Sequence, residues 1–263
     1  MGQTIAVGVD GSHPSDVALC WAAARAEQVG GRLIVAHALA DDPDAGGDGA
    51  VLPGRLRTAE DLLAAAGERA VALAPHAVVE TALVDGDPMW ELARAFPTVD
   101  ALVVGSHKTG FLRGEAYGSR SLQLIAAATA PVVTVPAGTD RTGRGIVVGL
   151  DDDSPSGRVA LDFAARQAAL THQELVLVRA VPAVSERSHA GSSLLEATRR
   201  SVSERWPDLR IRSRLVSGAP APALVRAAAR AALLVVGASR APFGVPFVVG
   251  RVTHDVLLNR SAP

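Results

Sequence analysis

Short aliphatic runs alternate along the chain with longer, alanine-rich stretches that are typical of helices. Within each short run nearly every residue is apolar, as expected for strands of a parallel sheet that helices cover on both faces. The alternation therefore predicts repeated β-α-β units. The runs predict strands at residues 4–9, 32–38, 78–84, 101–105, 132–135, 146–150, 174–180, 211–216 and 233–237.

The stretches between these runs predict helices that cross from one parallel strand to the next. Pro14 and Pro88 suit the first turn of a helix, because the N–H that proline lacks has no partner within the helix at that position. The predicted helices lie at residues 15–29, 56–74, 87–96, 118–128, 156–171, 190–206, 221–231 and 250–259.

The same unit occurs twice in the chain. Leu102-Val103-Val104-Gly105 returns as Leu234-Val235-Val236-Gly237, and further matches occur along both copies. The matching segments are 102–107 with 234–239, Gly118 with Gly250, 130–131 with 262–263, 8–10 with 149–151 and 86–88 with 218–220. The chain is a tandem duplication of one α/β unit, so a function must be assigned to each copy separately.

The repeat sets the domain boundaries. We expect a first domain at residues 1–137, a polar and glycine-rich linker at 138–145 and a second domain at 146–263. Pro131 is followed by the strand at 132–135, whereas its counterpart Pro263 is the last residue, so the second copy lacks its fifth strand. Either the sequence stops short of this strand or another segment covers that edge of the sheet.

Composition excludes several classes of protein. A hydrophobic content of 48% with 20% charged residues indicates a folded globular protein. The formal net charge of −1 provides no overall field that would attract nucleic acid or an anionic membrane. The sequence shows neither a secretory leader nor an apolar stretch of membrane-spanning length, so we expect a cytoplasmic protein.

The strongest candidate for a binding site runs from Gly105 to Ser119, after a predicted strand and into a predicted helix. Ligands of open parallel sheets bind outside the carboxyl ends of the strands. Glycines let the backbone approach an anion, and the free amides at a helix N-terminus donate to it. Asp10 ends the first strand at the same edge and could accept hydrogen bonds from a ribose or a base.

With these residues, the repeated unit resembles the universal stress protein family. Nucleotide-binding members of that family carry Gly-x2-Gly-x9-Gly-Ser/Thr after the fourth strand and an aspartate at the end of the first. The resemblance covers nearly the whole chain twice, so the chain is identified as a tandem, two-domain member. It implies two flavodoxin-like, Rossmann-like α/β domains of the adenine nucleotide alpha hydrolase type. Their parallel sheets would have five strands, less the missing last strand of the second.

The resemblance also implies a ligand, namely ATP with a divalent ion such as Mg²⁺, and the residues that would bind it. Gly105 matches the first glycine of the motif, and Gly118 and Ser119 match the closing pair that wraps the phosphates. Asp10 matches the aspartate at the adenosine. Ala38, which ends the second predicted strand with His37, matches the residue whose main chain meets adenine.

Lys108 departs from this motif, because it stands in place of the second glycine. A left-handed backbone at this position would cost a lysine roughly 1 kcal/mol. The ammonium could instead reach a phosphate, or it could point into solvent while the loop merely turns.

The second copy departs further from the motif. Arg240 replaces the second glycine, and Gly250-Arg251 replaces Gly-Ser. Arg251 could pair with a phosphate, or it could fill the site and satisfy Asp151. We favour the second interpretation, which makes this copy a degenerate one.

Other candidate chemistry is weaker. The acidic run at residues 151–154 is more typical of a solvated helix cap than of a metal site, so no metal site is expected. His107 has no carboxylate at a readable spacing to orient it, and we expect no catalytic residue. The arginines between residues 199 and 214 lack interleaved aromatics, so they indicate a solvated face more than a nucleic-acid site.

We therefore expect a universal stress protein whose first domain binds ATP in a stress response. Hydrolysis should be slow at most, because no base, arginine finger or complete phosphate loop is arranged for it. The alternative is a nucleotide-independent interaction or dimerisation module, which Lys108, Arg240 and Arg251 favour. The resemblance further implies pairing between the two domains and a possible homodimer.

Overall fold

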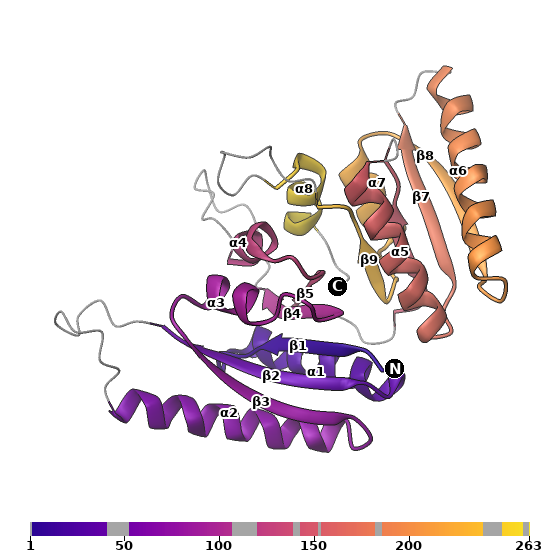
Figure 1. Cartoon of the computed structure of the whole chain (residues 1–263). Coiled ribbons are helices and arrows are strands. Elements are labelled where there is room, and N and C mark those ends of the chain that lie inside the picture. The colour runs from indigo at the N-terminus through magenta and orange to yellow at the C-terminus, as the bar shows by residue number, and fades with distance from the viewer. Residues whose placement is uncertain are drawn as a thin grey trace. The chain divides into compact units, whose positions relative to one another are not determined.

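The computed structural model describes residues 2–40, 53–106, 120–138, 143–151, 154–181, 186–238, 249–259 and 263. The chain divides into two compact units, Met1–Ala137 (unit 1) and Gly138–Pro263 (unit 2), each of which has its own sheet (Figure 1). Within the described ranges, none of the helices combines the length and the apolar character that crossing a membrane requires.

Unit 1 contains a five-stranded parallel sheet in the order β3-β2-β1-β4-β5. The central strands are almost entirely buried because helices cover both faces, whereas β3 lies at an edge and is largely exposed. The strands are β1 (Thr4–Gly8), β2 (Arg32–Leu39), β3 (Val78–Asp85), β4 (Ala101–Ser106) and β5 (Val132–Pro136).

Two helices of unit 1 begin directly after a residue whose side chain caps them. Ser12 accepts a hydrogen bond from the backbone N–H of Ser15, and Asp87 accepts from two N–H groups in the first turn of the third helix. The first helix ends at Gly30, whose left-handed φ of 58° suits glycine. The helices are α1 (His13–Val29), α2 (Pro53–Leu73), α3 (Pro88–Ala95) and α4 (Arg120–Ala127).

Aliphatic side chains form the core of unit 1. On one face of the sheet, Leu92 of α3 and Leu124 of α4 pack against Ala6, Ala36 and Leu102. α1 packs along β1 and β4, where it buries Leu19 and a series of alanines. Close helix packing follows from these small side chains, and it brings the N-terminus of α1 against the end of β4.

Unit 2 repeats this arrangement with a four-stranded parallel sheet in the order β8-β7-β6-β9. Its strands are β6 (Ile146–Gly149), β7 (Leu175–Val181), β8 (Ile211–Ser217) and β9 (Leu233–Val235). Its helices are α5 (Pro155–Leu170), α6 (Glu186–Arg205), α7 (Pro220–Ala227) and α8 (Arg251–Asn259). On the face that carries α7 and α8, Leu224 and Val256 pack against Val147 and Val176.

The edge of the second sheet agrees with the expectation of four strands among the described residues of unit 2. The N–H of Leu234 donates to the carbonyl of Pro263 at 2.7 Å, as the N–H of Leu102 donates to Pro131 at 2.8 Å. Pro263 thus stands where the approach to β5 stands in unit 1. The expected fold of two tandem flavodoxin-like domains, the second without its fifth strand, is confirmed.

Candidate functional site

The first candidate site lies at the carboxyl edge of the unit 1 sheet, where β1 and β4 end side by side. After β1 the chain enters α1, and α4 comes after β4 and packs with α3 on the other face (Figure 1). Open parallel sheets bind their ligands where successive connections leave in this way. Asp10, Ala38 and Gly105 all lie at this edge.

Asp10 follows β1 and its carboxylate is held by the next turn. Ser12 donates its backbone N–H to Asp10 Oδ1 at 3.0 Å, and the Asp10 N–H donates to Ser15 Oγ at 3.3 Å. Partial desolvation by itself raises the pKa of Asp10, but the hydrogen bonds of Ser12 and Ser15 and the charge of Arg120 outweigh it. The pKa lies below its ordinary value, so the group is a permanent hydrogen-bond acceptor near pH 7.

Ala38 presents main-chain groups beyond the end of β1. The Val9 N–H donates to the Ala36 carbonyl at 2.8 Å, so the main chain of Ala36 faces β1. Main-chain groups of alternate residues in a strand point to the same side, so those of Ala38 face the same way. The pairing of β1 with β2 ends at Gly8 and Ala36, which leaves the Ala38 groups without a β1 partner.

His37 fastens the second strand to the residue before Asp10. Its ring Nδ1 lies 2.7 Å from the carbonyl oxygen of Val9. A carbonyl only accepts, so Nδ1 carries the proton and donates. The sequence singled out His37 only as the neighbour of Ala38, and this contact gives it a positioning part of its own.

Gly105 is required by packing. A Cβ on Gly105 would lie 2.2 Å from the carbonyl oxygen of Pro14 and 2.7 Å from the Ser15 nitrogen, in the first turn of α1. In unit 2, a Cβ on Gly237 would lie 2.9 Å from the carbonyl carbon of Ser156 in α5. Because both copies need this glycine for close helix approach, its presence alone does not indicate phosphate binding.

Three of the expected binding residues, Lys108, Gly118 and Ser119, lie outside the described residues. The structure resumes at Arg120, the first residue of α4, and the charge of Arg120 is close enough to lower the pKa of Asp10. The positive charge of Arg120 therefore acts on the carboxylate that follows β1.

Sequence reasoning missed Ser12, Ser15 and Arg120 as parts of this site. A serine pair three residues apart before a predicted helix is a capping signal, and it could have been read as the group that holds Asp10. Arg120 directly follows Gly118-Ser119, but nothing in the sequence places a residue of the fourth helix beside Asp10.

Unit 2 organises the corresponding edge differently. Asp151 accepts hydrogen bonds from the N–H and the hydroxyl of Ser154, the residue that caps α5. Its carboxylate lies against Gly157 in the first turn of that helix. Arg179 stands at the position of His37, and its Nη1 donates to the Asp151 carbonyl at 2.7 Å. A guanidinium of β7 therefore binds the main chain after β6 in unit 2, whereas in unit 1 the His37 ring binds the Val9 carbonyl.

The expectation that Arg251 satisfies Asp151 is wrong. Arg251 lies at the start of α8, its side chain is 95% exposed, and its Nε is 3.8 Å from Asp255 Oδ2. Arg251 interacts instead with Asp255, four residues later on the helix surface. The carboxylate of Asp151 accepts its hydrogen bond from Ser154. Arg240 lies outside the described residues.

A metal site within the described ranges would require a cluster of ligating side chains. No group of three or more histidine, cysteine, aspartate or glutamate side chains comes together there as a metal site. Asp151 belongs to the helix cap, as the acidic run predicted, while Asp152, Asp153 and His107 fall outside these ranges.

Comparison with known proteins agrees with this architecture. The sequence model of the universal stress protein family matches residues 1–136 and again 144–263. A universal stress protein of Mycolicibacterium smegmatis is 26% identical over 98% of this chain and 95% of its own length. One from Mycobacterium bovis is 28% identical over 96% and 92%. The crystal structure of a universal stress protein from Archaeoglobus fulgidus covers 99% of this chain and 94% of its own, with a TM-score of 0.76 at 16% identity, which indicates a shared fold.

Proposed function

The chain belongs to the universal stress protein family, and we propose that its unit 1 binds an adenine nucleotide, ATP, at the carboxyl edge of the sheet. The observation that carries the proposal is a pairing of groups at one edge. The main chain of Ala38 faces outward beyond β1, and the carboxylate of Asp10 stands beside that opening. A main-chain donor and acceptor suit the edge of adenine, and an ionised carboxylate suits ribose hydroxyls.

The phosphates would then extend toward the start of α4. Free amides at a helix N-terminus favour negative charge, and by the family resemblance Gly118 and Ser119 supply them. Arg120 adds a positive charge whose effect already reaches Asp10. Lys108 would supply a second cation in place of the backbone that a glycine would provide.

Unit 2 would act as a structural or regulatory copy that does not bind nucleotide. Arg179 and Ser154 already use the groups of Asp151 that correspond to those of Asp10. We further propose that ATP is held without rapid turnover. Regulation would follow from a difference in nucleotide affinity between two states of the protein.

Calorimetric titration of the whole chain with Mg-ATP tests this proposal. We expect one site per chain. Asp10→Ala should weaken binding at least tenfold, since a hydrogen bond to a charged group contributes roughly 1.5–3 kcal/mol. Asp151→Ala is the matched control, because it removes the corresponding carboxylate of unit 2 and should leave the affinity unchanged.

Two outcomes would overturn the assignment of the site. Absence of heat at millimolar Mg-ATP would favour the nucleotide-independent interaction module, for which Lys108 and Arg240 in place of motif glycines also argue. An unchanged affinity in Asp10→Ala, with a loss in Asp151→Ala, would move the site to unit 2.

A further inference from the structure

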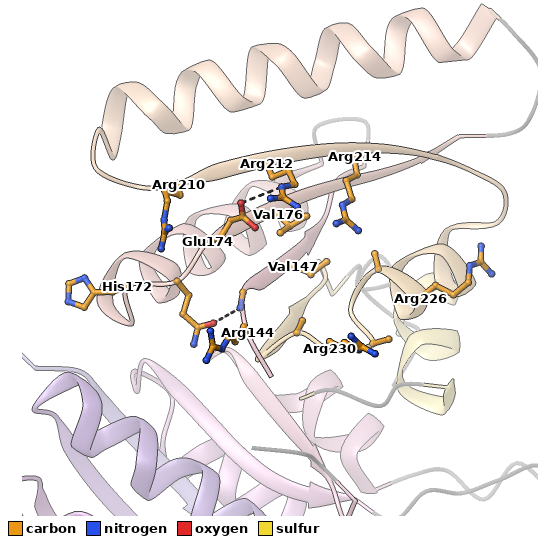
Figure 2. A pocket seen from close by; sticks show the side chains of 15 residues that line it. Arg144, Val147, His172, Glu174, Val176, Arg210, Arg212, Arg214, Arg226 and Arg230 are labelled. Atoms are coloured by element: carbon orange, nitrogen blue, oxygen red, sulfur yellow. Dashed lines mark hydrogen bonds and ion pairs between the residues drawn. The ribbon is translucent and has the colours of Figure 1, made fainter. Parts of the chain in front are cut away.

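A second concave site lies in unit 2, at the opposite edge of the sheet from the edge discussed above. Its volume is about 880 Å³, and Gly145, Glu174 and Arg210 line it directly before β6, β7 and β8. The end of α7 closes one side of it. Six arginines line this arginine pocket (Figure 2): Arg144, Arg210, Arg212, Arg214, Arg226 and Arg230.

The positive charge of the arginine pocket is largely uncompensated. Glu174 is the one carboxylate that lines it, and Glu174 Oε1 lies 3.4 Å from Arg212 Nε. The other five guanidinium groups make no hydrogen bond or ion pair with any residue that the structure describes. Like charges that converge in this way repel one another, so the free protein gains no stability from their arrangement.

Backbone hydrogen bonds fix the chain segments that carry three of the exposed arginines. The Arg144 N–H donates to the Arg230 carbonyl at 2.9 Å, and the Leu175 N–H donates to the Arg210 carbonyl at 2.9 Å. In Figure 2, the arginines on and next to β8 lie on one side of the pocket, and Arg144 and Arg230 lie across from them. The charges thus come from separate segments that the fold fixes.

The fold itself does not require these arginines, as unit 1 demonstrates. The two units can be aligned by the register of their strands and by the prolines, Pro88 and Pro220, at which α3 and α7 begin. In this alignment the six arginines, in chain order, correspond to Gln3, Val78, Glu80, Ala82, Arg94 and Thr98 of unit 1, where Val78, Glu80 and Ala82 match Arg210, Arg212 and Arg214. The single arginine among them, Arg94, pairs with Glu91 at 2.6 Å, and Ala223 stands at the position of Glu91 in unit 2.

The favourable effect of a helix C-terminus on positive charge accounts for at most two of the six arginines. Arg226 and Arg230 stand at the C-terminal end of α7, where backbone carbonyls favour positive charge. This argument does not extend to Arg210, Arg212 and Arg214, which belong to β8 and the residue before it.

We propose that the arginine pocket binds a small molecule that carries two or more phosphate groups. The planar guanidinium group donates two parallel hydrogen bonds that match phosphate oxygens. The unpaired guanidinium groups together carry more positive charge than a ligand with a single carboxylate would balance. A volume of this size suits a small ligand, whereas a flat basic face would suit a macromolecule. Val147 and Val176 supply an apolar floor on which an uncharged part of the ligand could rest.

Titration of the whole chain with sodium tripolyphosphate, without Mg²⁺, tests the proposal by calorimetry. We expect binding that weakens at least tenfold in Arg214→Gln/Arg230→Gln. The control is Arg57→Gln/Arg200→Gln, which makes the same change in net charge at exposed positions of α2 and α6. Affinity should change less than twofold in this control, and thermal unfolding should verify that both variants are folded.

Three outcomes would overturn the proposal. They are no heat at millimolar tripolyphosphate, equal weakening in both double variants, and weakening in Arg120→Gln with none in Arg214→Gln/Arg230→Gln. The last outcome would place the anion at the edge of unit 1, where Arg120 supplies the positive charge. Both Asp10→Ala and Arg214→Gln/Arg230→Gln are titrated with Mg-ATP as well. The nucleotide site of unit 1 responds to Asp10→Ala and the arginine pocket to Arg214→Gln/Arg230→Gln, so failure of one site is distinguishable from failure of the other.

Discussion

The two units share their strand order as far as β9 and their helix order, but they differ at both edges of the sheet. At the carboxyl edge, the pairing of β1 with β2 ends before Ala38 in unit 1, whereas Arg179 reaches the Asp151 carbonyl in unit 2. At the amino edge, unit 2 collects arginines where unit 1 has mostly uncharged residues. Duplication thus preserved the packing of the fold and let the side chains at strand ends diverge.

The two units have an exposed ion pair at corresponding positions, but the acidic and basic residues have exchanged places. Arg32 pairs with Glu80 in unit 1, and at the corresponding positions Glu174 pairs with Arg212 in unit 2. The signs are reversed while the geometry is kept. Exposed pairs of this kind contribute about 0–1 kcal/mol, so either sign serves folding, and in unit 2 the arginine of the pair lines the arginine pocket.

The largest effect is expected at the glycine that both units share. Gly105→Ala would force a Cβ to 2.2 Å from a backbone oxygen, whereas Gly237→Ala would meet backbone atoms at 2.9 Å and beyond. The first should lower the free energy of unfolding by about 3 kcal/mol and the second by about 1 kcal/mol. Urea denaturation of the two variants measures this difference. Equal losses would contradict the tighter helix approach in unit 1.

The next effect tests the carboxyl edge. His37→Arg introduces into unit 1 the residue that unit 2 has at that position. The guanidinium should reach across the opening beside Ala38 and weaken Mg-ATP at least tenfold, and the lost His37–Val9 hydrogen bond should cost about 1 kcal/mol of stability. Calorimetry and thermal unfolding separate the two effects. His76→Arg, at an exposed position of unit 1, is the control, and equal affinities in both variants would contradict the interpretation.

Much of the fold could be predicted from the sequence because continuous apolar runs and a tandem repeat leave few arrangements open. Helix starts were less accurate, since they depend on caps. α1 begins at His13 because Ser12 caps it, two residues before the predicted start. α2 and α6 also begin three and four residues before the predicted starts.

The sites could be predicted only in part, because strand ends bring together residues that are distant in the sequence. Asp10 and Ala38 followed from a motif, but the influence of Arg120 on Asp10 depends on a helix that starts more than a hundred residues later. Arg251 illustrates the opposite error. The sequence suggested a partner in Asp151, but an aspartate one helical turn away was closer.

The edge of β9, which pairs with no further strand of the described sheet, gives a smaller, stabilising prediction. Extension of the chain after Pro263 by Val-Val-Thr-Val-Pro, the sequence of β5, would give unit 2 the strand that unit 1 has. The added ladder should raise the midpoint of thermal unfolding by about 3 °C. An extension in which prolines replace the donors that face β9 is the control. An unchanged midpoint would indicate that the edge is already covered.

The smallest effect concerns the free energy of unfolding at acidic pH. The folded-state pKa of Asp10 lies below the ordinary value of 3.8, so near that pH the unfolded chain binds more protons than the folded one. The contribution of Asp10 to the free energy of unfolding is therefore complete above the ordinary value and is lost as the pH falls through the folded value. Urea denaturation of the wild type and Asp10→Asn should show a constant difference from pH 7 to 5 and a shrinking one below about pH 4. A difference that grew on acidification would mean that desolvation dominates at Asp10, and the carboxylate would then not be the prepared acceptor that distinguishes unit 1 from unit 2.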